Sequence, residues 1–370
     1  MIAPTPVART PERVASALLA LLLSAWVVSV FLSHWSLLDG FPRNGLSRFL
    51  EWQAHKPFAY RVLAPAVVDE VDALLPESVR TVLANRVAPV LRARYLEPLF
   101  VRWEPFGVNP AGRADWERSH YRSAYVLMVL LMLASLAAAM FLMRDAARML
   151  GASAIGAFVA MLVYAAVLPT LFLHGGYFYD FTEQFLALAL LCCVLRERWV
   201  LSLFVVALMQ LNKESALLMV VFLMPYLWHA RGWRGVAWAV PQLGVCFALL
   251  FWVRSKFAES PGQSSEWHLP DNLAFWADPA TWSATEDLYS LNLPLPRITF
   301  LCFALATLAI GWTRRKAAPT PTLVAATLAF ATLLPLLVTM GFRDEWRNLS
   351  LAVPLLVLLL VEPRADALRA

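Results

Sequence analysis

The stretch WVLSLFVVALMQLNKESALLMVVFLMPYLWH, residues 199–229, decides the topology of the chain. As one helix it would be about 46 Å long at 1.5 Å per residue, whereas the hydrocarbon core of a bilayer is about 30 Å thick. The letters NKES stand in its middle, at 212–215, where a single span would hold charged side chains deep in lipid. We therefore expect two short helices that turn at these residues.

The composition is that of a membrane protein. Of the 370 residues, 60% are hydrophobic and 15% are charged, and the mean hydropathy is +0.61. A globular domain has about 45–50% apolar and about 25% charged residues. Long apolar stretches lie at 14–34, 120–143, 152–173, 233–253, 321–340 and 348–361. We expect one all-α polytopic domain over residues 1–370, with about ten transmembrane helices of roughly 20 residues or fewer. The first stretch lacks a small-x-small cleavage site, so we expect it to be a retained span.

Short loops rich in Arg or Lys orient membrane proteins, because such loops stay in the cytoplasm. The basic clusters are Arg9 and Arg13, Arg144 and Arg148, Arg196 and Arg198, Arg231 and Arg234, and Arg314 to Lys316. A turn at NKES places all of these clusters on one side. We interpret the net charge of +5 in the same way and expect no nucleic-acid partner. The bias toward Arg over Lys is typical of GC-rich bacterial coding, so we expect a bacterial inner membrane.

The opposite, periplasmic face then receives two long loops, 35–119 and 254–296. Residues 58–75 place apolar side chains at helical spacing between acidic ones, and 79–102 alternate Val and Leu with Arg. Both patterns predict interfacial helices in the first loop. The basic helix serves either as a membrane-surface anchor or to recognise a lipid phosphate. The second loop mixes Trp and Tyr with acidic residues, which suits either the membrane interface or sugar binding.

Shorter polar turns on the same face contain candidate site residues. HGGYFYDFTEQ places His174, Tyr177, Tyr179, Asp180 and Glu183 at the start of a membrane helix. One carboxylate there would serve as a helix cap, whereas two beside a His and two Tyr favour a site.

Two further turns add cations to this face. In LNKES, Lys213 and Glu214 form either a structural ion pair, with each other or with Asp180, or a phosphate contact through Lys213. GFRDEWR contains Arg343 and Arg347, whose guanidinium forks suit phosphate oxygens. A solvated, charged helix start is the alternative for this last turn.

Asp39 stands just beyond the first span, where it is either a turn residue in DGFP or a general base reaching into an outer cavity. The four cysteines, at 192, 193, 246 and 302, lie in apolar stretches and predict no disulfide or zinc site. No nucleotide-binding, Rossmann, zincin or hydrolase motif is present. We expect no firm cofactor, although acidic residues on separate loops could still converge on a divalent metal.

PFAYRVLAP (57–65), YDFTEQFLALALL (179–191), LNKESALL (211–218) and EWRNLSLAVP (345–354) together resemble bacterial polytopic proteins of the GT-C glycosyltransferase superfamily and, more distantly, glycolipid-anchor mannosyltransferases. In those relatives an acidic pair in a D-x-T-E or Y-S-E form opens a membrane helix, as Asp180, Thr182 and Glu183 do here. A later R-E-T or R-S-N turn corresponds to residues 213–215, with Lys in place of Arg.

The resemblance implies transfer of a sugar from a polyprenyl-phosphate donor to an acceptor on the periplasmic face. It implies a catalytic acid in the first external loop, which falls to Asp39, with Glu51 or Asp180 as the alternative base. Asp180 and Glu183 are the other expected catalytic residues and would shape the sugar site. The expected substrate-binding residues are Tyr60, Arg61, His174, Tyr177, Lys213, Glu214, Arg343 and Arg347. A flippase or transporter of a lipid-linked glycan, or a non-enzymatic envelope-assembly subunit, is the alternative. The expected partners are the polyprenyl-phosphate sugar donor and membrane lipid, and the sequence does not identify a protein partner.

Overall fold

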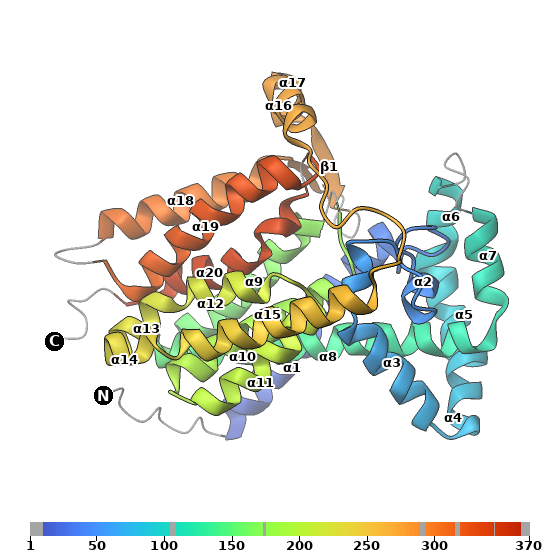
Figure 1. The fold of residues 1–370 in the computed structure, drawn as a ribbon, viewed down its shortest axis with the longest axis horizontal. Coiled ribbons are helices and arrows are strands. Elements are labelled where there is room, and N and C mark those ends of the chain that lie inside the picture. Colours follow the sequence, from blue (N-terminus) through green and yellow to red (C-terminus); the bar gives the residue numbers. More distant parts are fainter. Residues whose placement is uncertain are drawn as a thin grey trace.

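The computed structural model describes residues 10–103, 109–172, 175–288, 293–314, 319–343 and 345–363. Helices make up most of this part of the chain (Figure 1). Five segments are long and apolar enough to cross a membrane. They comprise α1 (Thr10–Trp35), α8 (Ser119–Met149), α9 (Ala154–Phe172), α14 with α15 (Trp233–Val236, Ala239–Lys256) and α19 (Pro321–Met340). The chain is thus a helical protein with the character of a membrane protein.

Shorter helices complete the bundle. These are α10 (Tyr179–Leu195), α11 (Trp199–Asn212), α12 (Ala216–Phe222), α13 (Met224–Arg231), α18 (Thr299–Arg314), and the 3₁₀ helix η5 (Trp346–Ala352) that continues into α20 (Val353–Val361). Nearly every side chain of α10 is buried, so this helix lies inside the bundle. Its acidic first turn is therefore surrounded by protein.

The predicted break in residues 199–229 is confirmed. Helix α11 ends at Asn212 and α12 begins at Ala216, with Lys213 in an extended conformation between them. The Asn212 amide is fully buried and donates to the backbone oxygen of Tyr179 at 3.0 Å. This bond attaches the turn to the start of α10, so two of the predicted polar segments lie side by side.

Three of the predicted basic clusters, those of Arg144, Arg196 and Arg231, lie together at one end of the bundle. Ion pairs connect Arg144 to Glu12 at 3.9 Å, Arg196 to Asp145 at 2.9 Å, and Arg231 to Glu197. At the same end Glu362 accepts hydrogen bonds from Thr320 and Thr322 at the start of α19. Figure 1 shows α2–α7 at the opposite end.

The predicted first external loop, residues 35–119, is named the first external segment. It is helical, as predicted. It contains α2 (Leu46–Leu50), η1 (Phe58–Tyr60), α3 (Leu63–Leu74), α4 (Glu77–Val82), η2 (Leu83–Val87), α5 (Ala88–Leu91), η3 (Arg92–Leu96), α6 (Glu97–Trp103) and α7 (Asn109–Glu117). The turns η2 and η3 are π-helical and stand just before Pro89 and Pro98. Proline has no N–H for the usual bond to residue i−4, so the helix widens there instead of ending.

The predicted second external loop, residues 254–296, is named the second external segment. It contains a short β-hairpin, which the all-α fold class did not predict. After α16 (Leu269–Ala277) and α17 (Pro279–Ser283), strands β1 (Thr285–Leu288) and β2 (Leu293–Pro296) pair antiparallel, with Thr285 opposite Pro296. Leu288 stands opposite Leu293 at the other end of the ladder. The hairpin lies outside the apolar bundle, so the spans remain helical (Figure 1).

Candidate functional site

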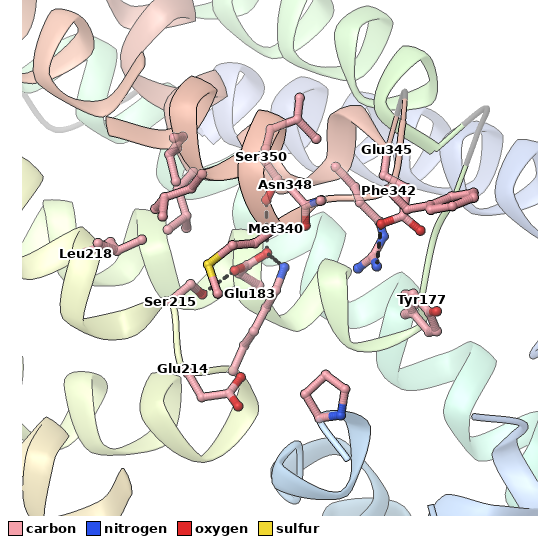
Figure 2. A pocket seen from close by; sticks show the side chains of 18 of the residues that line it. Tyr177, Glu183, Glu214, Ser215, Leu218, Met340, Phe342, Glu345, Asn348 and Ser350 are labelled. Carbon is pink, nitrogen blue, oxygen red and sulfur yellow. Dashed lines mark hydrogen bonds and ion pairs between the residues drawn. The ribbon is translucent and has the colours of Figure 1, made fainter. Parts of the chain in front are cut away.

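A cavity of about 390 Å³ lies at the end of the bundle away from the basic helix ends. Its walls come from the segments that the sequence singled out. They supply Pro57, Phe58 and Arg61; Tyr177 and Glu183; Lys213, Glu214, Ser215 and Leu218; Glu266 and His268; and residues of α19 and η5 (Figure 2). Cavities of roughly 300–1,000 Å³ are typical of small-molecule sites.

Lys213 sits between two fully buried carboxylates at the floor of the cavity. Its ammonium nitrogen lies 3.2 Å from Asp180 Oδ1 and 2.9 Å from Glu183 Oε2. The other Asp180 oxygen, Oδ2, accepts from the Tyr177 backbone N–H at 3.0 Å. Asp180 therefore caps the start of α10 and also binds Lys213, so both roles considered from the sequence are present.

Two serine hydroxyls also donate hydrogen bonds to the Glu183 carboxylate. Ser215 donates to Oε1, and Ser350 donates to Oε2 at 2.9 Å. Figure 2 shows both serines pointing toward Glu183 from opposite sides. Buried charges are stable only when they are paired and hydrogen-bonded, and here every oxygen of the two acids has a partner. The cluster is therefore a fixed structural centre.

Arg347, on η5, is the next cation of this charge cluster. Its guanidinium lies 3.8 Å from Asp180 Oδ2 and 3.4 Å from Glu345, and it stacks 4.2 Å from the Tyr177 ring centroid. Burial raises the pKa of Tyr177 to about 12, so its hydroxyl stays neutral at physiological pH. The site thus presents a fixed cation beside a hydrogen-bonding phenol.

Arg61 supplies a second guanidinium. The Val62 N–H donates to the Leu211 backbone oxygen at 2.9 Å, which fixes this part of the first external segment against the end of α11. Arg61 donates to the Tyr179 hydroxyl at 2.9 Å and lies 3.8 Å from Glu214. Burial alone would lower the pKa of Arg61. The electrostatic interactions with Tyr179 and Glu214 are stronger than this effect and raise that pKa above its usual value. Both cations on this side of the cavity remain charged.

The facing wall is apolar. Helix α19 contributes Leu333, Leu336, Leu337 and Met340. Of these, Leu336 is 37% exposed and Met340 44% exposed, so the wall continues onto the outer surface of the bundle. The cavity is therefore lined by cations and carboxylates on one side and by hydrocarbon on the other.

The structure does not bring every predicted residue to the cavity. Tyr60 is buried beside it and hydrogen-bonds to Ser264 at 3.0 Å, while the Arg343 guanidinium stacks on Phe275 and Phe342. Glu51 binds Arg118 on the surface. His174 lies outside the described residues. Arg61, Tyr177, Glu183, Lys213, Glu214 and Arg347 line the cavity, and Asp180 contacts three of them, Tyr177, Lys213 and Arg347.

Asp39 does not face the cavity, which corrects the expectation that it reaches into it. Its side chain is fully buried and accepts hydrogen bonds from Tyr121, from Ser36 at 2.8 Å and from the Leu37 N–H at 3.3 Å. Tyr125 in turn hydrogen-bonds to Ser36 at 2.7 Å. This polar cluster attaches the end of α1 to α8, so Asp39 is placed as a structural carboxylate.

We predict that Asp39→Asn becomes more stable relative to the wild type as the pH rises. Burial raises the pKa of Asp39, while hydrogen bonds from Tyr121, Ser36 and Leu37 oppose burial only in part. Stabilisation by the neutral form is complete below the unfolded pKa, about 3.9 for Asp, and is lost as the pH rises through the folded value. Asparagine is neutral at every pH, so the Asp39→Asn protein does not lose this stabilisation as the pH rises.

The measurement is the unfolding temperature of both proteins in detergent between about pH 5 and pH 8. Asp39→Ala is the contrasting variant, because it deprives the Tyr121 and Ser36 hydroxyls of their acceptor at a cost of about 1–3 kcal/mol. A difference between Asp39→Asn and wild type that stays constant with pH would contradict the raised pKa of Asp39.

Sequence reasoning missed the groups that complete the site. Ser215 and Ser350 donate hydrogen bonds to Glu183. The sequence signal for them was a hydroxyl residue two positions after Lys213 and another three positions after Arg347. Glu266 and His268 line the cavity from the second external segment, where the sequence left the choice between interface and sugar binding open. Within the described residues, no three His, Cys, Asp or Glu side chains come together as metal ligands. The Lys213 ammonium lies between the two buried acids.

Comparison with known proteins gives no assignment: no family model, no curated protein and no solved structure matches this chain. The chemistry of the cavity therefore carries the functional argument.

Proposed function

We propose that this chain is a GT-C-type membrane glycosyltransferase that transfers a sugar from a polyprenyl-phosphate donor to an acceptor hydroxyl. The observation that carries the proposal is the division of one cavity into an apolar wall on α19 and a facing wall of guanidinium, ammonium, carboxylate and hydroxyl groups. A lipid-linked sugar has the same division between hydrocarbon and polar headgroup.

The cations suit the leaving group. Arg347 and Arg61 present planar forks that match phosphate oxygens, and both are held by aromatic rings and acids before any ligand arrives. When the bond between sugar and phosphate breaks, negative charge grows on the phosphate, and fixed cations stabilise that charge. Lys213 is committed to Asp180 and Glu183, so its part is to hold the floor of the site.

The acids and hydroxyls suit the sugar. Glu214 and Glu345 line the cavity, and their side chains are 26% and 21% exposed. Such carboxylates accept hydrogen bonds from sugar hydroxyls, and the neutral Tyr177 phenol adds a group able to donate or accept. Asp180 and Glu183 shape the pocket from beneath through Lys213.

The sidedness follows from the basic helix ends. Positive loops stay in the cytoplasm, and the cavity lies at the other ends of α10, α11 and α19. We therefore propose about ten spans in a bacterial inner membrane, with the cavity open to the periplasmic face. A transporter site would lie near the midplane, whereas this cavity lies at the helix ends away from the basic clusters, which favours transfer over transport.

Purified protein in proteoliposomes with radiolabelled polyprenyl-phosphate hexoses and pentoses tests the proposal, with octyl glycosides as acceptors. We expect label to move from donor to acceptor and polyprenyl phosphate to be released in equal amount. Movement of intact donor across the bilayer without bond formation would assign a flippase instead. Absence of both transfer and donor binding would assign a non-enzymatic role.

A further inference from the structure

Residues 257–268 form a strap that crosses from the end of α15 to the start of α16, beside the cavity. The Lys56 N–H donates to the Pro261 backbone oxygen at 2.7 Å, and the Lys56 ammonium donates to Ala258 at 2.7 Å. At its far end the His268 N–H donates to the Thr339 backbone oxygen at 2.9 Å. The strap is thus fixed both to the first external segment and to α19.

The strap places an oriented imidazole in the cavity wall. His268 Nε2 lies 3.1 Å from Glu266 Oε2, and Glu266 Oε1 accepts from Arg43 at 2.5 Å. The imidazole packs edge-on against Phe342, with ring centroids 5.3 Å apart. Both His268 and Glu266 line the cavity. Backbone, carboxylate and aromatic contacts therefore fix the direction of the ring.

The charge on Glu266 selects the tautomer of His268. Burial opposes that charge, but hydrogen bonds from Arg43 and His268 outweigh burial and lower the pKa of Glu266. An ionised carboxylate only accepts hydrogen bonds, so the neutral imidazole places its proton on Nε2 and its lone pair on Nδ1. Within the described chain, Nδ1 has no hydrogen-bond partner. A carboxylate that orients a histidine by a hydrogen bond to one ring nitrogen is a common arrangement for a general base.

The acids of the cavity are less suited to take a proton. Each oxygen of Asp180 and Glu183 already accepts a hydrogen bond or an ion pair. Glu214 is paired with Arg61 and Glu345 with Arg347. A base needs a free lone pair in the cavity wall, and His268 lines the cavity with no hydrogen bond at Nδ1 in the described chain.

We infer that His268 is the general base that deprotonates the acceptor hydroxyl, with Glu266 as its positioning residue. This inference rests on the proposed function. The acceptor oxygen forms a bond to the anomeric carbon of the donor as its O–H proton passes to Nδ1. The bond between that carbon and the phosphate oxygen breaks, and its electron pair leaves with the lipid phosphate. His268 then returns the proton to water.

The charged groups around His268 come from several elements, and one of them, Arg343, stacks on the Phe342 ring that packs against the imidazole. On its own strap it contacts Glu266, and Arg43 of the first external segment lies behind that carboxylate. Thr339 and Phe342, its contacts from the neighbouring helix and turn, are uncharged. Across the cavity the charged residues are Arg61, Glu183, Lys213, Glu214, Glu345 and Arg347.

The test compares His268→Gln and Glu266→Gln with the wild type, using the radiolabelled polyprenyl-phosphate sugar that the wild type accepts and an octyl glycoside. General-base catalysis contributes about 10²–10⁴-fold, so His268→Gln should lose this factor in kcat while its KM for donor changes less than threefold. Wild-type activity should fall on the acid limb of the pH profile, because a protonated imidazole cannot take the proton of the acceptor hydroxyl. The variant should lack that limb, and added imidazole should restore part of its rate.

Glu266→Gln should retain the acid limb with a lower kcat, because the imidazole remains but is less well oriented. His229→Gln, on the exposed last turn of α13 at the opposite end, is the matched control and should behave as wild type. Full kcat and an unchanged pH profile in His268→Gln would overturn the assignment while leaving the transferase intact. A wild type that neither binds donor nor transfers sugar would overturn the proposed function itself.

Discussion

Lys213→Met should destabilise the folded protein by about 3–5 kcal/mol, the cost of breaking a buried ion pair by removing one partner. The ammonium is the cation in contact with both Asp180 and Glu183, and both carboxylates are fully buried. Without it, Glu183 keeps two serine hydroxyls, and Asp180 keeps a backbone amide with Arg347 at the longer distance of 3.8 Å. Unfolding by heat or by a denaturing detergent, monitored by circular dichroism, measures the loss.

Lys256→Met is the matched control, because this lysine is exposed on the last turn of α15 and the same substitution there buries no charge. Adding Glu183→Gln to Lys213→Met should recover part of the lost stability, since it removes one of the unpaired charges. An unfolding transition of Lys213→Met that coincides with that of the wild type would contradict the structural role of the cluster.

Arg347→Met should lower kcat for sugar transfer by about 10²–10³-fold, the usual effect of removing one group that stabilises developing negative charge. Its guanidinium is buried, stacked on Tyr177 and directed into the cavity that we propose holds the phosphate. Transfer from the polyprenyl-phosphate donor measures the effect. Arg347→Lys should recover only part of the rate, because ammonium keeps the charge but loses the fork.

Loss of fold must be separated from loss of chemistry in this variant, since Arg347 also pairs with Glu345 and Asp180. Circular dichroism and size-exclusion chromatography at the assay temperature make that separation. Arg234→Met, exposed on α14 at the opposite end, is the matched control. A folded Arg347→Met protein with wild-type kcat would remove the guanidinium from the mechanism.

Patterns within one segment predicted the helical framework. The length of residues 199–229 and the charge at their centre required the turn between α11 and α12, and apolar spacing indicated helices in the first external segment. These features depend on local hydrophobicity and on the thickness of a bilayer, which the sequence carries directly. The short β1–β2 hairpin has no comparable signal over four-residue strands, and the prediction omitted it.

The position of Asp39 could not be predicted from its distance to the first span. Ser36 and Leu38 adopt positive φ values of 46° and 57°, and Gly40 has φ 80°. These left-handed residues turn the chain back into the protein, where Tyr121 and Tyr125 of α8 complete the cluster around Asp39 and Ser36. The partners are more than 80 residues away in the sequence, so no local pattern indicates them.

The orientation of His268 also depends on a residue that is distant in the sequence. Its carboxylate partner is two residues away, and this Glu-x-His spacing was visible in the sequence. The arginine that holds that carboxylate is 223 residues distant, and only the folded strap brings it near. Composition could therefore suggest a polar surface in this loop, whereas the direction of one imidazole nitrogen depended on tertiary contacts.

The exposed apolar flank of α19, formed by Leu336 and Met340 with Phe342 beside it, has a consequence for how substrate arrives. The proposed donor, with its long isoprenoid tail, would diffuse sideways within its leaflet and enter between helices, without leaving hydrocarbon for water. Its search would then be two-dimensional, and its abundance per unit of membrane area, rather than per volume of water, would set the rate of encounter. Micelles crowded with detergent tails would compete for this lateral entrance and slow the protein.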